Sequence, residues 1–324
     1  MRIAVIGAGA WGTALAIQAA RVVPDVVLWA RDPMRAALMR GVGKNARHLP
    51  GVTFPQGMRV TSEAEEALDG AAIAVLAVPT QFLAAVLEGL PPLPPVILAA
   101  KGVETATLRL PHEIVAAARP GLSVALLSGP NFAEEIAAGL PAAAVLATTD
   151  GDLAEAGVAR LSSAAFRVYA GSDPVGVAVG GAAKNVAAIA AGATIGAGYG
   201  ENARAALVTR ALAEIGRLSA ALGGRAETVA GLSGLGDLML TCASPKSRNF
   251  SLGVAIGQGE DARAILATRS SVTEGVATAP AILARARSVG VAMPVAEAIA
   301  AVLEGKLTVR DAMRSLMTRP LREE

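Results

Sequence analysis

Cysteine, histidine and aromatic residues are scarce in this sequence of 324 residues. The single cysteine, Cys242, excludes an internal disulfide and a multi-cysteine metal site. The two histidines, His48 and His112, lie far apart in the chain and argue against a zinc site. Aromatic residues, on which nucleic-acid bases stack, make up only 3% of the chain, and the net charge is only +2. The composition therefore argues against a nucleic-acid-binding protein. We therefore expect neither a bound metal nor a nucleic-acid partner.

Long hydrophobic runs are also lacking, although hydrophobic residues make up 53% of the chain. Charged residues interrupt the apolar runs before they reach the length that spans a bilayer. Met1 and Arg2 lead directly into the apolar segment IAVIGAG without a small-residue cleavage site, which argues against a signal peptide. We expect a cytoplasmic protein without an integral membrane segment, and the length is sufficient for two domains.

Lysine is rare, because only five of the 29 Lys and Arg residues are lysines. An arginine keeps its proton in a protein, whereas a lysine is able to lose it. Lys184 stands in the apolar segment Gly180–Gly192, where burial would disfavour its charge and suit it to proton transfer near neutral pH. Judged from that segment alone, the more common arrangement is that the side chain of Lys184 extends from an apolar helix and places its ammonium group in water. A bias in genome composition is the other explanation for the few lysines.

The first thirty residues carry a dinucleotide-binding pattern. A buried strand is predicted over residues 1–7, the motif GxGxxG at residues 7–12 leads into a helix pattern, and a second strand follows over residues 25–29. In such a unit the glycines allow a tight turn close to a pyrophosphate, and the helix N-terminus attracts that anion. Trp11, inside the turn, packs either against the cofactor or under the loop.

The residues after the second strand, Arg31 and Asp32, bear on the choice of cofactor. An acidic residue at this point hydrogen-bonds the ribose hydroxyls of NAD, whereas an arginine accommodates the 2′-phosphate of NADP. Arg31 comes first and Arg35 lies one helical turn further on, so we expect NADPH to be favoured, with NAD as the alternative. In the other interpretation, Arg31 stacks on the adenine or faces solvent.

More strand patterns follow, and polar residues stand at their ends. The predicted strands are Ala72–Val78, Val96–Ala100, Ser123–Leu127 and Ala142–Ala147. Ligands of an open parallel sheet bind beyond the carboxyl ends of the strands, where Lys101 and the turn Ser128–Asn131 fall. The helix pattern Ala133–Gly139 then offers a second N-terminus for an anion, although a simple strand-to-helix connection explains it equally well.

From Val175 onward, strand patterns give way to helix patterns. We therefore predict an α/β protein with two domains. The N-terminal domain, residues 1–174, should be a Rossmann-type domain with a doubly wound, mostly parallel sheet. The C-terminal domain, residues 175–324, should be all-helical, bind the substrate and carry out catalysis. In the second domain, Asp237 lies in a glycine-rich bend and suits either a ligand site or a helix N-cap. The tripeptide Ser247–Asn249 supplies a hydroxyl, a guanidinium and an amide, which together suit a phosphate; a solvated turn is the alternative.

Eight stretches, in the same order over nearly the whole chain, resemble the bacterial-type NAD(P)-dependent glycerol-3-phosphate dehydrogenases. They are GAGAWGTALA (7–16), RHLPGVTFP (47–55), AKGVE (100–104), SGPNFAEE (128–135), KNVAAIAAG (184–192), GLGDLMLTC (234–242), SRN (247–249) and VTEGVATA (272–279). Two positions depart from the usual pattern of the family. His48 stands where Tyr is frequent, and Asn131 stands where Ser or Thr is usual, which leaves the hydrogen bonding of the substrate loop open.

The resemblance implies an enzyme that interconverts dihydroxyacetone phosphate and sn-glycerol 3-phosphate by hydride transfer with NAD(P)H, supplies glycerol 3-phosphate for glycerophospholipid synthesis, and forms a homodimer. It implies Lys184 as the general acid and base, with Lys101, Asn185, Asp237 and Thr241 as further catalytic residues. In this interpretation Lys101 polarises the carbonyl oxygen or contacts the substrate, and Asn185, Asp237 and Thr241 orient the lysine and the substrate hydroxyls. Substrate-binding residues implied in this way are Lys101, Gly129, Asn131, Lys184, Asp237, Ser247, Arg248 and Asn249. Cofactor-binding residues implied in this way are Gly7, Gly9, Ala10, Trp11, Gly12, Arg31, Lys101, Ala133, Arg248, Val272 and Glu274.

Without the resemblance, the residues indicate only an NAD(P)-dependent oxidoreductase with an anionic substrate. Dehydrogenases of the β-hydroxyacid or 6-phosphogluconate type have a similar build, but they lack the adjacent Lys184 and Asn185 and the SGPNFAEE turn. A nucleotide-sensing protein is the alternative from another class. It would bind the cofactor without turnover.

Overall fold

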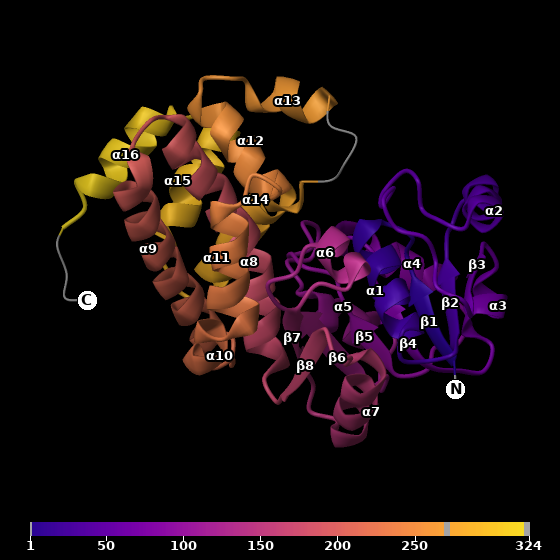
Figure 1. Cartoon of the computed structure of the whole chain (residues 1–324). Helices are drawn as coiled ribbons and strands as arrows, with labels where there is room; N and C mark the ends of the chain where they lie inside the picture. The colour runs from indigo at the N-terminus through magenta and orange to yellow at the C-terminus, as the bar shows by residue number, and fades with distance from the viewer. Residues whose placement is uncertain (1, 269–272, 321–324) are drawn as a thin grey trace. The chain divides into compact units, whose positions relative to one another are not determined.

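The structure, a computed structural model, describes residues 2–268 and 273–320 (Figure 1). The chain divides into two compact units. The first comprises Met1–Lys101 and Arg109–Ala178, and the second comprises Gly102–Leu108 and Val179–Glu324. The domain boundary predicted from the sequence lies at residue 174, which is the first residue of helix α8 (Pro174–Gly196). The division between the two compact units follows Ala178, and the short segment Gly102–Leu108 belongs to the second unit.

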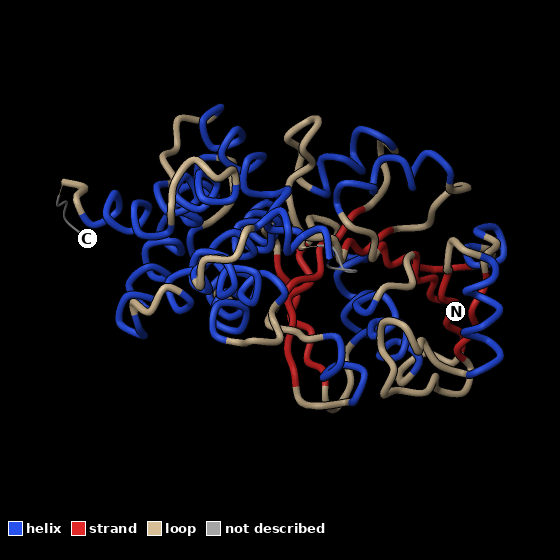
Figure 2. Tube along the Cα trace, turned by 90° about the horizontal axis from the view of Figure 1, so that it is seen from above, coloured by secondary structure: helices blue, strands red, loops and turns tan. Residues whose placement is uncertain are grey.

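The described residues of the first unit form an eight-stranded sheet, with the strands in the order β3-β2-β1-β4-β5-β6-β7-β8 (Figure 2). The strands are β1 (Arg2–Ile6), β2 (Asp25–Trp29), β3 (Met58–Thr61), β4 (Ala71–Leu76), β5 (Val96–Leu98), β6 (Val124–Ser128), β7 (Ala142–Ala147) and β8 (Phe166–Gly171). Neighbours are parallel except for β6 and β7, which are antiparallel. The order reverses between β1 and β4, as in a Rossmann-type sheet, so the predicted fold class is confirmed.

Two strands of this sheet escaped the sequence prediction, β3 and β8. Both lie at an edge of the sheet, and both contain an exposed arginine, Arg59 in β3 and Arg167 in β8, instead of forming a fully apolar run. Strand β3 has four residues, MRVT, and β8 reads FRVYAG with Arg167 and Tyr169 exposed. The apolar run that suffices to recognise a central parallel strand is absent from such edge strands.

Helices connect the strands, and the first of them is buried nearly all round. The helices of this unit are α1 (Ala10–Ala20), α2 (Pro33–Val42), α3 (Ala64–Leu68), α4 (Leu83–Gly89), α5 (Pro111–Ala118), α6 (Ala133–Ala138) and α7 (Gly151–Leu161). The residues from Gly12 to Ala19 of α1 are all buried, and α1 packs against α6 and α7 as well as against the strands. Buried Gln18 donates to Leu161 O at 2.9 Å, which fixes the rotation of this apolar helix.

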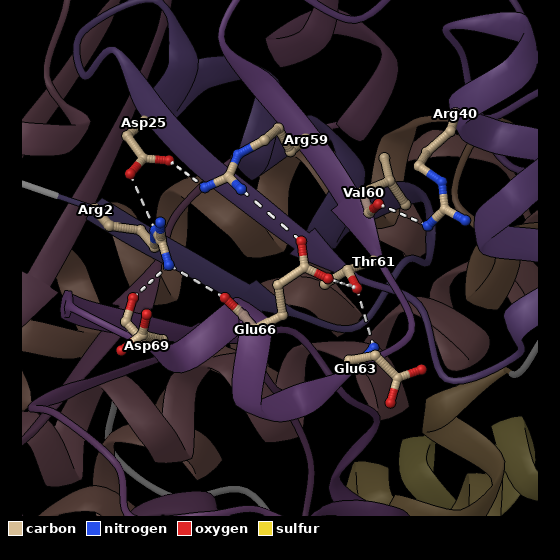
Figure 3. Close-up of polar contacts among 9 residues, drawn as sticks. All are labelled: Arg2, Asp25, Arg40, Arg59, Val60, Thr61, Glu63, Glu66 and Asp69. Atoms are coloured by element: carbon tan, nitrogen blue, oxygen red, sulfur yellow. Dashed lines mark hydrogen bonds and ion pairs between the residues drawn. The ribbon is translucent and has the colours of Figure 1, made fainter.

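A network of arginines and carboxylates ties the edge strand β3 to its neighbours (Figure 3). Asp25 accepts from Arg2 Nε at 3.0 Å and from Arg59 Nη2 at 2.9 Å. The hydrogen bond from Arg59 is the main cause that lowers the pKa of Asp25, although burial opposes it. Arg40 of α2 donates to Val60 O at 3.1 Å. Charged side chains thus join the edge of the sheet to the strands and helices beside it.

From Val179 onward, the described residues of the second unit form helices joined by turns and loops, as predicted. It contains the larger part of α8, followed by α9 (Gly200–Ala221), α10 (Ala226–Ala230), a π-helical turn (Leu232–Gly236), α11 (Asp237–Ala243), α12 (Arg248–Gly257), α13 (Ala262–Thr268), α14 (Glu274–Ser288), α15 (Pro294–Leu303) and α16 (Val309–Met317). Helix α8 is long and apolar enough to cross a membrane by length and composition alone. However, 94% of that apolar window is buried inside the protein, which is the pattern of a core helix.

Helices α8 and α12 cross with their backbones in contact. A Cβ atom at Gly253 would lie 2.0 Å from Ile189 O, and one at Gly192 would lie 2.1 Å from Phe250 O. One turn further along, a Cβ atom at Gly196 would lie 2.1 Å from Val254 O. Only glycine allows so close an approach, because the neighbouring atoms are backbone and have no rotamer with which to withdraw.

This crossing predicts a selective response to one added methyl group. Gly253→Ala should lower the free energy of unfolding by about 1–3 kcal/mol or more, because the helices must separate to admit the Cβ atom. Gly216→Ala, on α9, is the matched control: no atom lies within 4 Å of its Cβ position, and the change should be neutral or stabilise by about 0.5–1 kcal/mol. Guanidinium unfolding followed by circular dichroism measures both, and equal effects would contradict the backbone contact.

A buried carboxylate caps helix α15 from a neighbouring helix. Glu214 of α9 is 3% exposed, and it accepts from Val295 N at 2.8 Å and from Ala296 N at 3.4 Å. Burial raises the pKa of Glu214 to about 7, although the two backbone N–H groups and Arg217 act in the opposite direction. Glu297 adds to the rise. The folded protein therefore binds a proton at Glu214 more readily than the unfolded chain does.

Stability should consequently fall as the pH rises through about 7, since the contribution of Glu214 is fully present only below its ordinary pKa of 4.5. The shift corresponds to a change on the order of 3 kcal/mol between the two limits. Glu214→Gln keeps an oxygen acceptor for Val295 N, and it should remove this pH dependence. Unfolding midpoints from pH 5 to pH 8 measure the slope, with Glu260→Gln, which removes an exposed carboxylate elsewhere in the second unit, as the control. Parallel slopes for the wild type and Glu214→Gln would contradict the assignment.

Candidate active site

The glycine turn after β1 is shaped by close backbone packing on one side and by open space on the other. Gly7 has φ +115°, and a Cβ atom there would lie 2.7 Å from Ala77 O. A Cβ atom at Gly12 would lie 1.9 Å from Gly7 O. In contrast, no atom lies within 4 Å of the Cβ position of Gly9, which is the N-cap of α1 and supplies no side-chain cap. The turn is therefore uncrowded at Gly9, next to the first N–H groups of α1, which is the geometry that a dinucleotide-binding turn requires.

Two side chains support this turn: Arg35, which the sequence analysis considered only for the choice of cofactor, and Asn45, which it missed. Asn45 Nδ2 donates to Ala8 O at 3.0 Å and to Thr13 Oγ1 at 2.8 Å, and Arg35 Nη2 donates to the same carbonyl at 2.6 Å. No motif marks Asn45, because its role depends on the path of a long loop. Trp11 is partly buried and packs against the core of the first unit, which agrees with packing under the loop.

At the end of β2, the carboxylate of Asp32 is engaged in a helix cap. It caps α2, accepting from Met34 N at 3.0 Å and from Arg35 N at 3.3 Å. Arg31 is exposed. Burial, followed by the nearby positive charge of Arg47, lowers the pKa of Arg35, although Asp32 acts in the opposite direction. Arg35 and Arg47 thus lie close enough for their positive charges to repel each other.

The remaining candidates of the first unit follow strands β5 and β6. Lys101 follows β5 and is partly exposed. Asn131 Nδ2 donates to Ala143 O at 3.1 Å, so the amide that replaces the usual Ser or Thr is anchored to β7. A Cβ atom at Gly129 would lie 2.8 Å from the same carbonyl. Ala133 is the first residue of α6, whose first turn already carries Glu134 and Glu135, and these charges disfavour a second anion there.

The second unit buries a lysine against a carboxylate. Lys184, on α8, is 9% exposed, and Asp237, at the start of α11, is 1% exposed. Lys184 Nζ donates to Asp237 Oδ1 at 2.5 Å and to Thr241 Oγ1 at 3.0 Å. The arrangement in which Lys184 extends into water is therefore wrong. The carboxylate stabilises the ammonium form, which is the form that donates a proton.

The π-helical turn Leu232–Gly236 delivers Asp237 to this position. A Cβ atom at Gly180 of α8 would lie 2.9 Å from Ser233 O, so the turn rests directly on the helix that carries Lys184. Asp237 is the first residue of α11 and Gly236 is the N-cap, so the interpretation of Asp237 as an ordinary N-cap is wrong. Thr241, one turn along α11, donates to Asp237 O at 2.6 Å while it accepts from Lys184. Cys242 beside it is inert, because burial raises the pKa of its thiol to about 12.

The predicted phosphate tripeptide begins helix α12. Ser247 is its N-cap and accepts from Phe250 N at 3.2 Å, so this hydroxyl has a capping role within the fold. Arg248 is the first residue of the helix and is exposed. Asn249 Nδ2 donates to Asn185 Oδ1 at 2.9 Å, and Asn185 Nδ2 donates to Glu274 Oε2 at 3.2 Å. The structure therefore joins Asn185, Asn249 and Glu274, which the sequence could not show to be neighbours.

One candidate, Val272, lies outside the described residues. Within the described parts of the chain, no group of three or more His, Cys, Asp or Glu side chains is arranged to hold a metal ion. A dinucleotide-binding turn in one unit and a buried lysine with a carboxylate partner in the other are the features of a nicotinamide-dependent dehydrogenase.

Comparison with known proteins gives the particular kind of dehydrogenase. Residues 2–154 match the family model described as the N-terminus of NAD-dependent glycerol-3-phosphate dehydrogenase, and residues 173–314 match the model of its C-terminus. The chain belongs to this family. Relatives named glycerol-3-phosphate dehydrogenase (NAD(P)+) include one from Rhodospirillum rubrum, 49% identical over 99% of this chain and 93% of the relative. Another, from Parvibaculum lavamentivorans, is 47% identical over 100% of this chain and 98% of the relative.

Among solved structures, the glycerol-3-phosphate dehydrogenase of Coxiella burnetii superposes with a TM-score of 0.93. It is 35% identical in sequence, and the match covers 98% of this chain and 99% of that one. The resemblance drawn from the eight sequence stretches is thus confirmed at the level of the family, over the full length of the chain. The chain is therefore an NAD- or NADP-dependent dehydrogenase.

Proposed function

We propose that this chain interconverts dihydroxyacetone phosphate and sn-glycerol 3-phosphate with NAD(P)H, and that Lys184 is its general acid and base. The observation that supports this role is the buried contact of Lys184 with Asp237 and Thr241. A dehydrogenase that reduces a ketone must add a proton to oxygen while hydride arrives at carbon. A lysine held as the ammonium ion by a buried carboxylate is suited to that task.

In the direction of reduction, Lys184 Nζ donates its proton to the carbonyl oxygen, and in the direction of oxidation the amine takes the proton back from the hydroxyl. The bound nicotinamide supplies or accepts the hydride. Asp237 keeps Nζ in place through the contact at 2.5 Å, and Thr241 fixes its direction. A positioned proton donor of this kind contributes a factor of about 10²–10⁴ in rate. Lys101 would contact or polarise the same carbonyl oxygen.

The substrate phosphate would bind at the start of α12. The exposed guanidinium of Arg248 lies in the first turn of the helix, where the helix dipole also favours an anion. Ser247 supports this position as the N-cap, and Asn249 offers an amide in the same turn. Gly129 and Asn131 are proposed as further substrate contacts, and Ala133, Arg248, Val272 and Glu274 as cofactor contacts, on the resemblance to the family.

NADPH is the cofactor that we propose to be favoured, at the glycine turn formed by Gly7, Gly9, Ala10, Trp11 and Gly12. The carboxylate of Asp32 caps α2, whereas Arg31 is exposed and Arg35 lies close to Arg47. This concentration of positive charge suits a 2′-phosphate. On the resemblance alone, we further propose a cytoplasmic homodimer that supplies glycerol 3-phosphate for glycerophospholipid synthesis.

The reaction is tested by following NADPH absorbance with dihydroxyacetone phosphate and, in parallel, with unphosphorylated dihydroxyacetone. Oxidation is expected only with the phosphorylated compound. Lys184→Ala should cut kcat by about 10²–10⁴-fold while NADPH still binds. The control is Lys306→Ala, because Lys306 is exposed and paired with Glu304. Tight binding of NADPH without turnover of either compound by the wild type would refute the function, and near-normal turnover by Lys184→Ala would refute the role of the lysine.

The cofactor preference is tested at Arg31. Arg31→Ala should raise the dissociation constant for NADPH more than that for NADH, because only NADPH carries the 2′-phosphate. Arg310→Ala removes an exposed positive charge of the same kind from the second unit and serves as the control for general charge effects. Fluorescence titration with both nucleotides gives the two constants, and an equal loss for both would instead indicate stacking on the adenine.

A further inference from the structure

Two buried asparagine amides and the first turn of α14 form a closed ring of hydrogen bonds within the second unit. Gly275 N donates to Asn249 Oδ1 at 3.1 Å, and Asn249 Nδ2 donates to Asn185 Oδ1 at 2.9 Å. Asn185 Nδ2 then donates to Glu274 Oε2 at 3.2 Å, and the peptide bond between Glu274 and Gly275 closes the ring. The ring joins three helices: α8 with Lys184, α12 with the phosphate tripeptide, and α14.

The direction of every hydrogen bond in this ring is determined. The backbone N–H of Gly275 is only a donor and the ionised carboxylate of Glu274 is only an acceptor, so both amide groups between them have one possible orientation. Asn185 is 4% exposed and Asn249 is 8% exposed, so turning either amide would leave buried polar atoms without partners. A Cβ atom at Gly275 would lie 2.7 Å from Asn249 Oδ1 and 2.7 Å from Asn185 O, so a glycine is needed for the ring to close.

The ring fixes what Asn249 is able to offer to a ligand. Its Oδ1 accepts from Gly275 and one hydrogen of its Nδ2 is donated to Asn185, so the second hydrogen of Nδ2 remains. In this orientation the side chain of Asn249 meets a ligand as a donor and suits a phosphate oxygen, beside Arg248 in the same turn. The oxygen of Asn185 is used in maintaining this arrangement, which differs from the role in orienting substrate hydroxyls that the resemblance implies.

We propose that Asn185 is a positioning residue, which orients the Asn249 amide toward the substrate phosphate and couples it to the carboxylate of Glu274. This inference rests on the proposed function for the identity of the phosphorylated substrate. The ring itself rests only on contacts within the second unit. Loss of the ring should therefore weaken phosphate binding through Asn249 without removing the proton donor Lys184.

Reversal of one donor tests the polarity of the ring. Asn185→Asp preserves shape, and its carboxylate would still accept from Asn249, but it would set a second carboxylate against Glu274. The KM for dihydroxyacetone phosphate should rise about tenfold or more at pH 8, with a smaller change in kcat. At pH 6 the increase should shrink, because two adjacent carboxylates share a proton. The charged residues adjacent in sequence to Asn185 and Asn249 are Lys184 and Arg248.

Exchange of both partners should restore the ring. In Asn185→Asp combined with Glu274→Gln, the new amide at position 274 would donate to the new carboxylate, so every hydrogen bond again has a donor and an acceptor. The KM of this double variant should return to within about threefold of the KM of Glu274→Gln alone. Glu274→Gln is the reference because Glu274 is also a proposed cofactor contact, and this single variant measures any separate effect of changing it. A double variant as impaired as Asn185→Asp, or a KM for Asn185→Asp within about twofold of wild type at pH 8, would overturn the proposal.

Inorganic phosphate gives a readout that does not depend on the reaction. The increase in melting temperature that phosphate causes is measured for the wild type, for both single variants and for the double variant. The increase should be lost in Asn185→Asp and regained in the double variant. If the wild type fails to reduce dihydroxyacetone phosphate while this pattern holds, the proposed function fails and the ring stands. If phosphate stabilises all four proteins equally, the ring does not control the phosphate site.

Discussion

The buried ion pair between Lys184 and Asp237 is the interaction on which the second unit depends. Removing both charges from water is costly, and the pair is tolerable only where its geometry is short and its other hydrogen-bonding atoms are satisfied. The contact at 2.5 Å and the flanking Thr241 meet both conditions. The backbone around the pair must be held closely as well. The π-helical turn that rests on Gly180 provides this, since it fixes the first residue of α11 against α8.

The same helix, α8, organises its other neighbours through small residues and not through large side chains. Gly192 and Gly196 allow the backbone of α12 to touch it, and Asn185 joins it to the first turns of α12 and α14. Aromatic residues make up only 3% of the chain, and alanine and glycine make this close packing possible. The consequence is a rigid frame in which the start of α12 and the lysine of α8 share one scaffold, as a site for a small phosphorylated molecule requires.

Much of the first unit was predictable, because central parallel strands are continuous apolar runs and the glycine motif comes directly after the first of them. Strands β2 and β7 begin and end where the sequence predicts. The edge strands β3 and β8 lack that signal. In the second unit the residues alone indicated Lys184 and Asp237 separately, and only the resemblance implied that Asp237 orients the lysine, because helix packing brings together residues that lie 53 positions apart. Asn45 escaped prediction for the same reason, since a loop carries it to the glycine turn.

The edge formed by β3 has a consequence for the protein in a crowded solution. In this strand Thr61 O accepts from Ala30 N of the neighbouring chain segment, so Val60 directs its backbone groups outward. Arg40 occupies the carbonyl of Val60, and Met58 N donates to Pro55 O in the preceding turn. A strand from another molecule would have to displace a charged arginine before pairing here. This side chain therefore hinders edge-to-edge pairing between folded molecules.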